Sequence, residues 1–244
     1  MTGQQAIDLI HERSWVGRKP GLERTQALLA RMGNPERTLK FVHITGTNGK
    51  GSTAAMTASV LAAAGYRTGL FTSPHLFRFH ERMQVNGEPI ADETLGRLTE
   101  QVLDLADGME DFPTEFELMT AVGMAFFAEQ KCDIVVLEVG LGGRMDSTNV
   151  IPAPEVAVLT NIGLEHTQEL GNTVALIAKE KSGILKPGCR CVLYHQSREA
   201  EEVVEGVCRE LSIPLTVTAT DTLKVQSVGL DGQVFSYRDA GTFR

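Results

Sequence analysis

The sequence predicts an α/β fold, in which a mostly parallel β-sheet carries helices on both faces. Short apolar runs typical of buried strands alternate along the chain with longer stretches whose apolar residues recur at helical spacing. This alternation is typical of βαβ units, whose crossover helices pack on the sheet. Two segments with Asn-Gly or Asp-Gly turns break the alternation, so we also expect an inserted and a C-terminal β-hairpin.

The first predicted elements lead into a glycine-rich turn. Apolar residues at helical spacing predict a helix over residues 22–32, and the Gly-Asn-Pro sequence at 33–35 is a combination that ends helices. A short apolar run predicts a strand over residues 41–44. The glycine-rich turn spans residues 46–52, and the Ala-rich stretch after it predicts a helix that ends near Gly65. The first strand is therefore expected to run through this turn into a helix.

The rest of the chain continues the alternation. Strands are predicted at residues 69–72, 133–139, 155–160, 190–194 and 215–218, and helices near residues 91–107, 115–130, 172–185 and 197–211. The inserted hairpin is predicted over residues 81–90, around Asn86-Gly87. The C-terminal hairpin is predicted around Asp231-Gly232, with strand positions at Leu223, Val225, Val234, Phe235 and Tyr237.

Composition and charge exclude several classes of protein. The 244 residues are 42% hydrophobic and 22% charged, which fits a globular chain and not a disordered one. The net charge of −8 argues against nucleic acid as the main partner. No apolar run approaches the roughly 18 residues of a membrane-spanning helix, and the N-terminus lacks the apolar core of a signal peptide. Four cysteines without a C-x-x-C pair predict reduced thiols, and we expect a cytoplasmic protein.

The glycine-rich turn has the composition of a phosphate-binding loop. It reads Gly46-Thr47-Asn48-Gly49-Lys50-Gly51-Ser52, and glycines between a strand and a helix let backbone N–H groups approach a phosphate at the helix N-terminus. Lys50 adds a cation. The strict P-loop pattern has glycine in place of Ile44 and Ser or Thr directly after the lysine, so this loop is a variant. We therefore expect a P-loop-type sheet that binds a nucleoside triphosphate; the alternative is a structural turn with an exposed lysine.

Two further segments place polar residues at the ends of predicted strands. Glu138 follows four apolar strand residues, at the edge of a parallel sheet where ligands bind and a carboxylate can hold Mg²⁺. The segment from Gly140 to Asp146 follows, with three glycines before Arg144 and Asp146. We interpret it as a loop that closes on a ligand. The alternatives are a solubilising surface glutamate and a merely flexible loop.

The histidines and one lysine-containing helix end are less specific signals. His166 lies just past the predicted strand 155–160, where an imidazole can serve as a metal ligand, although a lone histidine is more often structural. His75 is a weaker candidate for a metal ligand, and the sequence around the remaining histidines does not indicate a metal site. Lys179 and Lys181 sit near a predicted helix end, where cations are favoured for electrostatic reasons alone.

Residues 114–117 support two interpretations of equal weight. Thr114 and Glu117 have the spacing of a helix capping box, which needs no function. Phe116, between them, offers an aromatic face on which a flat ligand could stack.

Taken together, four blocks of sequence resemble the folylpolyglutamate synthase and dihydrofolate synthase family, within the Mur ligase superfamily. The blocks are the phosphate loop, Thr72-Ser73-Pro74-His75-Leu76, the run from Glu138 to Arg144, and His166 with Lys181-Ser182-Gly183. They occur in the family's order, and the resemblance runs from about residue 18 to 190. It implies an ATP-dependent amide ligase that adds L-glutamate to a folate, with dihydropteroate as a second acceptor left open, through an acyl phosphate.

The resemblance also implies roles for individual residues. Residues that match the family's ATP-binding loop are Thr47, Asn48, Gly49, Lys50, Gly51 and Ser52. Residues implied to hold Mg²⁺ are Ser73, Glu138 and His166. Lys50 and His166 are implied to act in catalysis, as is Lys181, which matches a lysine that is carbamylated in the family. Residues implied to bind the pterin-side substrate are Thr114, Phe116, Glu117, Arg144, Asp146 and Ser147, with Phe116 stacking and Asp146 accepting from pterin N–H groups.

One departure from the family concerns domain organisation. Residues 1–244 are expected to form the ATP-binding Mur ligase N-terminal or central domain, whereas family members continue into a second, smaller domain that supplies part of the nucleotide and glutamate sites. We therefore expect this chain alone to bind Mg-ATP weakly and to turn over poorly or not at all, and the full-length protein to be a monomer. The alternatives are a Mur-type ligase acting on another carboxylate and a nucleotide-binding module without activity of its own.

Overall fold

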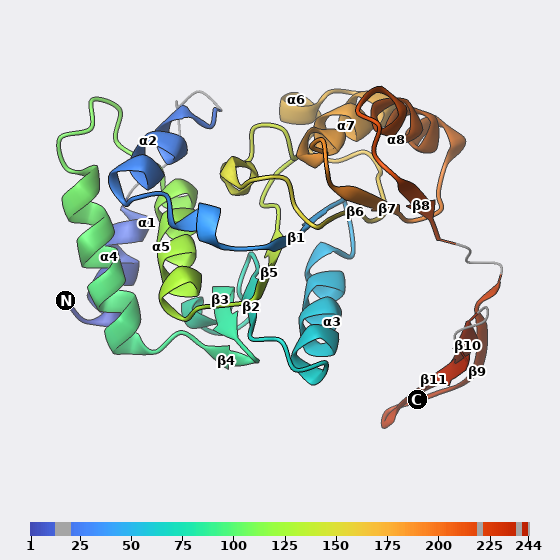
Figure 1. Ribbon diagram of the computed structural model, residues 1–244, viewed down its shortest axis with the longest axis horizontal. Coiled ribbons are helices and arrows are strands. Elements are labelled where there is room, and N and C mark those ends of the chain that lie inside the picture. The colour runs from blue at the N-terminus through green and yellow to red at the C-terminus, as the bar shows by residue number, and fades with distance from the viewer. Residues whose placement is uncertain (13–20, 219–221, 238–240, 244) are drawn as a thin grey trace.

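The computed structural model describes residues 1–12, 21–218, 222–237 and 241–243. An eight-stranded sheet lies at its centre, in the order β4-β3-β2-β5-β1-β6-β7-β8 (Figure 1). The strands from β2 to β8 in this order pair in parallel, whereas β3 and β4 add antiparallel strands at one edge. The predicted α/β fold with a mostly parallel sheet is confirmed.

The strands of this sheet lie within one or two residues of their predicted positions. They are β1 (Phe41–Thr45), β2 (Thr68–Phe71), β3 (Met83–Val85), β4 (Glu88–Pro89), β5 (Ile134–Glu138), β6 (Val156–Leu159), β7 (Arg190–Leu193) and β8 (Leu215–Val217). The central strand β1 pairs Ile44 with Glu138 of β5 and with Val158 of β6. The loops that follow β1, β2, β5 and β6 therefore leave from the same edge of the sheet.

One face of the sheet is covered by helix α3 (Lys50–Ala63), as Figure 1 shows. Val42 and Ile44 of β1 pack there against Ala54 and Ala58 of α3. The small alanine side chains let the helix lie close to the strands, which explains the Ala-rich sequence. Over β6 and β7, this face carries half-buried side chains such as Val158 and Val192.

The opposite face is covered by two groups of helices. Over β2, β5 and β1 lies α5 (Glu115–Glu129), surrounded by α1 (Gly3–His11), α2 (Glu23–Arg31) and α4 (Asp92–Ala106), and these helices share one large apolar core with the sheet. Over β6 and β7 lie α7 (Val174–Lys181) and α8 (Arg198–Glu210), with a second core. The functional loops lie where these two groups meet, at the carboxyl edge of the sheet.

The structure differs from the sequence-based expectations in a few elements. The helix predicted over 172–185 is shorter: α7 ends at Lys181, a 3-10 turn continues to Ile184, and the short α6 (Thr167–Leu170) precedes it. The helix α1 was not predicted. The inserted hairpin is confirmed as β3 and β4, and its Asn86-Gly87 turn has positive φ at both residues, the geometry that favours this pair.

The C-terminal hairpin is confirmed and gains a third strand, but the predicted strand position Leu223 lies just before the first of its strands. β9 (Lys224–Gly229), β10 (Gly232–Tyr237) and β11 (Gly241–Phe243) form a separate antiparallel sheet that stands apart from the body in Figure 1. Side chains on β9 are exposed, and those on β10 are exposed or half-buried.

Two expectations from composition can be compared with the described residues. All four cysteines are free and buried, as predicted for reduced thiols. Within the described part of the chain, no helix has the length and apolar character needed to cross a membrane.

Candidate active site

The predicted phosphate loop connects β1 to α3. Gly49 adopts a left-handed conformation at φ 84° and caps α3, whose first residue is Lys50. The Lys50 ammonium folds back over the loop and donates to the carbonyl oxygens of Gly46 at 2.9 Å and Thr47 at 3.2 Å. Because the first N–H groups of a helix have no partner within the helix, α3 presents donors and a cation at one point. This is the arrangement that binds phosphate groups.

The segment after β6 braces this loop. The backbone N–H of Thr47 donates to Asn161 O at 2.6 Å, and Asn48 and Asn161 form an isolated β-bridge. A Cβ at Gly46 would lie 1.8 Å from Thr160 Oγ1, so only glycine fits at this contact. The loop is therefore fixed in shape before any ligand binds.

Glu138 lies against the start of α3, at the end of β5. Its side chain is only 4% exposed and accepts a hydrogen bond from Ser73 N–H at 3.0 Å. Burial raises the pKa of Glu138, and the backbone hydrogen bond from Ser73 and the charge of Lys50 oppose that rise. The expectation of a carboxylate at this edge is thereby met, and the alternative of an exposed solubilising glutamate is wrong.

Glu138 and Ser73 fit a magnesium ion in their chemistry. Both carboxylate oxygens of Glu138 lie near the first turn of α3, 3.5 Å from where a Cβ on Gly51 would be. Carboxylate and hydroxyl oxygens are the ligands that Mg²⁺ prefers, completed by water and phosphate oxygens. Among the described residues, no group of three or more His, Cys, Asp or Glu is arranged to hold a metal on its own.

His166 lies farther along the loop that follows β6. It precedes α6 as its N-cap residue, with a left-handed backbone at φ 42°, and its side chain is exposed. The residue before it, Glu165, forms an ion pair with Lys181 at 2.5 Å. His166 therefore lies next to a residue whose side chain contacts Lys181.

Lys181 is buried at the end of α7, with only 1% of its side chain exposed. Burial lowers its pKa, and the contact with Glu165 opposes this change. A cation placed at a helix end only for its charge would be solvated, so that simpler interpretation of Lys181 is wrong. The adjacent glycine-rich loop packs on the same helix end: a Cβ at Gly143 would lie 2.8 Å from Lys181 O.

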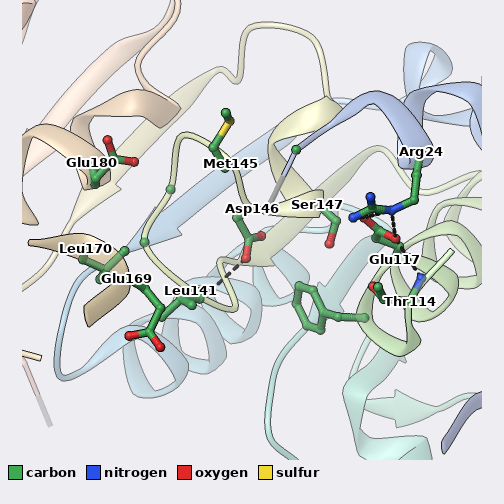
Figure 2. Close-up of a pocket in the computed structure, with 14 residues that line it drawn as sticks. Arg24, Thr114, Glu117, Leu141, Met145, Asp146, Ser147, Glu169, Leu170 and Glu180 are labelled. Atoms are coloured by element: carbon green, nitrogen blue, oxygen red, sulfur yellow. Dashed lines mark hydrogen bonds and ion pairs between the residues drawn. The ribbon is translucent and has the colours of Figure 1, made fainter. Parts of the chain in front are cut away.

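A cavity of about 410 Å³ opens on the α5 and α7 side of the sheet edge (Figure 2). Five of the six predicted substrate-binding residues line it, namely Thr114, Phe116, Glu117, Asp146 and Ser147. The lining residues that the sequence did not indicate include Arg24, Glu169, Leu170 and Glu180, whereas Leu141 and Met145 belong to the loop over residues 140–146 that was predicted to close on a ligand. The sixth predicted residue, Arg144, is not among the lining residues; its side chain pairs with Glu180 at 3.5 Å.

Asp146 is the buried acceptor at the centre of this cavity. Its carboxylate accepts from Leu141 N–H at 2.8 Å, Thr148 N–H at 3.0 Å and the Thr148 hydroxyl at 2.5 Å. Burial raises the pKa of Asp146, and these hydrogen bonds counteract the rise. As the N-cap of the 3-10 turn η3 (Ser147–Val150), it is fixed in orientation.

A buried ion pair forms the part of the cavity wall beyond Ser147, as Figure 2 shows. Arg24 of α2 donates to both carboxylate oxygens of Glu117, at 3.1 and 2.9 Å, and also to Asp111 at 2.8 Å. Glu117 additionally accepts from Thr114 N–H at 2.7 Å, which confirms the predicted capping box. Both oxygens of Glu117 thus have partners within the protein.

Phe116 lies on the same turn and packs edge-on against Phe71, with ring centroids 6.1 Å apart. It also contacts Gly140, where a Cβ would lie 2.6 Å from the ring. The ring is half-buried and lines the cavity. The two interpretations of residues 114–117 are therefore compatible, because the capping box holds the aromatic ring at the cavity.

Thr45 connects the phosphate loop to the cavity. It is the last residue of β1, directly before the loop, and its hydroxyl donates to Gly142 O at 2.6 Å. Gly142 belongs to the cavity wall. The predicted phosphate loop and the cavity thus lie on opposite faces of one sheet edge and share this strand end.

Comparison with known proteins gives consistent matches. The family model described as the Mur ligase middle domain matches residues 44–204. The dihydrofolate synthase/folylpolyglutamate synthase of Bacillus subtilis is 47% identical over 216 residues, which are 86% of this chain and 50% of that protein. A folylpolyglutamate synthase of Lacticaseibacillus casei is 40% identical over 84% of this chain and 49% of its own length. The chain spans about half the length of the curated relatives it matches.

Solved structures resemble the whole chain. A folylpolyglutamate synthase in complex with AMPPCP and folate has a TM-score of 0.90 and 35% identity, and it covers 99% of this chain, while this chain covers 60% of it. The C-terminal sheet therefore falls within the matched region.

Proposed function

The chain belongs to the Mur ligase family, in the branch of the folylpolyglutamate and dihydrofolate synthases, and on this premise we propose that it is the ATP-binding part of a glutamate ligase. The enzyme joins L-glutamate to a folate, or to dihydropteroate, by an amide bond. The observation that carries the proposal is the shared sheet edge, where an anion-binding loop and a cavity with a buried acceptor meet at Thr45.

ATP is proposed to bind with its phosphates in the loop from Thr47 to Ser52. Lys50 balances the charge of the terminal phosphates, since its ammonium already lies over the loop. A groove of about 520 Å³ beside the loop is a suitable place for the nucleoside. It lies on the α3 side of the sheet and is bounded by Asn48 and Thr53 on one side and Tyr194 on the other.

The acid substrate is proposed to bind in the cavity through its heterocycle. Phe116 offers a face for stacking, and Asp146 accepts from ring N–H groups of a pterin. Thr114 and Ser147 line the same wall. Glu117 supports this wall through its ion pair with Arg24. Arg144 supports it from behind through its ion pair with Glu180. We therefore propose that Glu117 and Arg144 position the wall and do not contact the substrate directly.

Mg²⁺ is proposed to bind with ATP at Ser73 and Glu138, with His166 as a further ligand from the loop before α6. When bound, the ion neutralises phosphate charge. Lys181 is proposed to be carbamylated. Carbamylation requires a neutral amine, and burial shifts the pKa of Lys181 in that direction. The modified side chain would carry a carboxylate at the sheet edge, and it would lose its ion pair with Glu165.

The chemistry then proceeds in two displacements. The substrate carboxylate attacks the γ-phosphorus of ATP, which gives an acyl phosphate and ADP. The amine of L-glutamate then attacks the acyl carbon, and inorganic phosphate leaves as the amide forms. Positioning and charge neutralisation suffice for the first step, and Lys50 together with the α3 N-terminus supplies both.

Mass spectrometry of a reaction mixture tests the ligase activity. The chain is incubated with Mg-ATP, L-glutamate and either dihydropteroate or a reduced folate, and a product heavier by one glutamyl unit establishes the reaction and its acceptor. Because the chain spans about half the length of its relatives, we expect little product, and ligand binding is measured as well. Mg-ATP and dihydropteroate should each raise the melting temperature. Lys50→Met should abolish only the Mg-ATP effect.

The alternatives give different results in the same assay. Stabilisation by a UDP-linked muramoyl substrate, and by neither folate nor dihydropteroate, would identify a ligase acting on another carboxylate. Stabilisation by Mg-ATP alone would indicate a nucleotide-binding module. We place the enzyme in the cytoplasm as a monomer, without nucleic acid or membrane partners, which size-exclusion chromatography and cell fractionation test.

A further inference from the structure

His43 lies in the middle of β1, fully buried beneath the cavity. Its Nε2 is 2.9 Å from the hydroxyl oxygen of Thr148, and that hydroxyl donates to Asp146 Oδ1 at 2.5 Å. The three side chains form a chain of hydrogen bonds from the core of the sheet to the cavity. His43 and Thr148 are each 0% exposed, so no bulk water competes for these bonds.

The hydrogen bonds fix which nitrogen of His43 carries hydrogen. Burial lowers the pKa of His43 to about 3, so the ring is neutral and has a single N–H. The threonine hydroxyl has one hydrogen, which it gives to Asp146, and it must therefore accept from Nε2–H. The other ring nitrogen, Nδ1, has no hydrogen-bond partner. A hydrogen on Nδ1 would leave a buried donor unpaired and would turn the threonine hydroxyl away from Asp146.

We propose that His43 is a positioning residue for the substrate site, which acts through Thr148 to aim the Asp146 carboxylate at a heterocycle with N–H donors. His43 donates to Thr148, Thr148 donates to Oδ1, and Leu141 N–H donates to Oδ2. The backbone N–H of Thr148 also donates to Oδ1. Both lone pairs of Oδ1 are therefore used within the protein, and Oδ2 is the oxygen left to accept from a ligand in the cavity. The proposal rests on the proposed function, because it assumes that the cavity binds such a heterocycle.

The role is specific to one of the two ligands. The chain of hydrogen bonds ends at Asp146 on the α5 side of the sheet, whereas the phosphate loop lies on the α3 side. Loss of the chain should therefore weaken binding of the acid substrate and leave Mg-ATP binding unchanged. A role in folding alone would instead lower thermal stability and affect both ligands equally.

Four variants and calorimetry test this inference. His43→Leu removes the donor, Thr148→Val removes the hydroxyl at constant shape, and His43→Gln restores a donor near the Nε2 position. Thr99→Val is the matched control, since Thr99 is a buried threonine on α4 whose hydroxyl has no partner. Titration with dihydropteroate and, separately, with Mg-ATP measures both affinities for each variant.

We expect His43→Leu and Thr148→Val each to weaken dihydropteroate binding about tenfold, the effect of losing one hydrogen bond to a charged group. The double variant should bind no more weakly than either single variant, because both act through one chain. His43→Gln and Thr99→Val should bind close to wild type. Unchanged dihydropteroate affinity in His43→Leu, or equal losses for both ligands, would overturn the inference.

Nuclear magnetic resonance gives a readout that does not depend on the ligand. The imidazole ¹⁵N signals of His43 should show a protonated Nε2 and a bare Nδ1, and the Asp146 carboxyl ¹³C signal should move alike in His43→Leu and Thr148→Val. Hydrogen on Nδ1, or an unmoved Asp146 signal in His43→Leu, would refute the role of His43. If the wild type fails to bind dihydropteroate, the proposed function fails, and these spectra still decide whether His43 controls Asp146.

Discussion

Replacing Arg24 by methionine should destabilise the protein through the partner that it leaves behind. The side chains of Arg24 and Glu117 are only 14% and 7% exposed, so both charges are largely removed from water. Removing one partner of a buried ion pair costs about 3–5 kcal/mol, because the other charge stays buried. Glu117 retains its bond from Thr114 N–H, so we place the loss near the lower end, at about 3 kcal/mol. The pair with Asp111, whose carboxylate is 58% exposed, adds little.

Denaturant and thermal unfolding measure this loss. For a chain of this size, about 3 kcal/mol corresponds to a fall in melting temperature of about 6–12 °C. The double variant with Glu117→Gln should recover part of the loss, because it removes the unpaired charge. Arg198→Met is the matched control: Arg198 pairs with Glu202 across one helical turn with both side chains more than half exposed, so about 0.3–0.5 kcal/mol is expected. An Arg24→Met loss as small as that of the control would refute the argument.

Three further predictions concern the sheet and its loops. Gly46→Ala should lower both melting temperature and Mg-ATP affinity, because its Cβ would overlap Thr160 Oγ1, whereas Gly163→Ala, which meets open space, should change neither. Glu138→Gln should make the protein more stable at neutral pH and weaken metal-dependent nucleotide binding. Burial raises the pKa of Glu138, so the stability of the wild type falls as pH rises through that folded-state pKa. Urea unfolding measured across a pH series should show that this pH dependence vanishes in the variant. Burial lowers the pKa of His43 from 6.5 to about 3, so the free energy of unfolding should decrease by about 1.4 kcal/mol per pH unit as pH falls between these two values. His43→Leu should reduce this decrease. An equally steep decrease in the variant would contradict the burial argument.

The parts of the site that lie close together in sequence could be predicted from it. The phosphate loop is a local pattern, since Gly49 and Lys50 occupy consecutive positions between a strand and a helix. Glu138 was predicted because four apolar residues identify a strand and its end. The Thr114 and Glu117 capping box was recognised from a spacing of three residues. In each case a short stretch of chain fixes the geometry.

The parts that depend on distant contacts could not be predicted. The apolar face of the helix that carries Arg24 can be recognised in the sequence. The partner of Arg24, Glu117, is 93 residues away, so in the sequence Arg24 cannot be distinguished from a solvated arginine. No neighbouring residue in the sequence indicates a role for His43, because its partner Thr148 is 105 residues away. Lys181 at a helix end looked solvated, and only the packing of the glycine-rich loop on that helix shows that it is buried.

The anchoring of the cavity wall at η3 has a consequence for the kinetics of binding. The Lys186 ammonium donates to Asn149 O at 2.8 Å and Ile151 O at 2.5 Å, and the Asn149 side chain donates to Gly183 O at 3.0 Å. This wall is thus ordered when the protein folds, and its conformational entropy is not lost again when a ligand arrives. Association should therefore follow a single exponential whose rate rises linearly with ligand concentration, without the plateau that a rate-limiting rearrangement would impose.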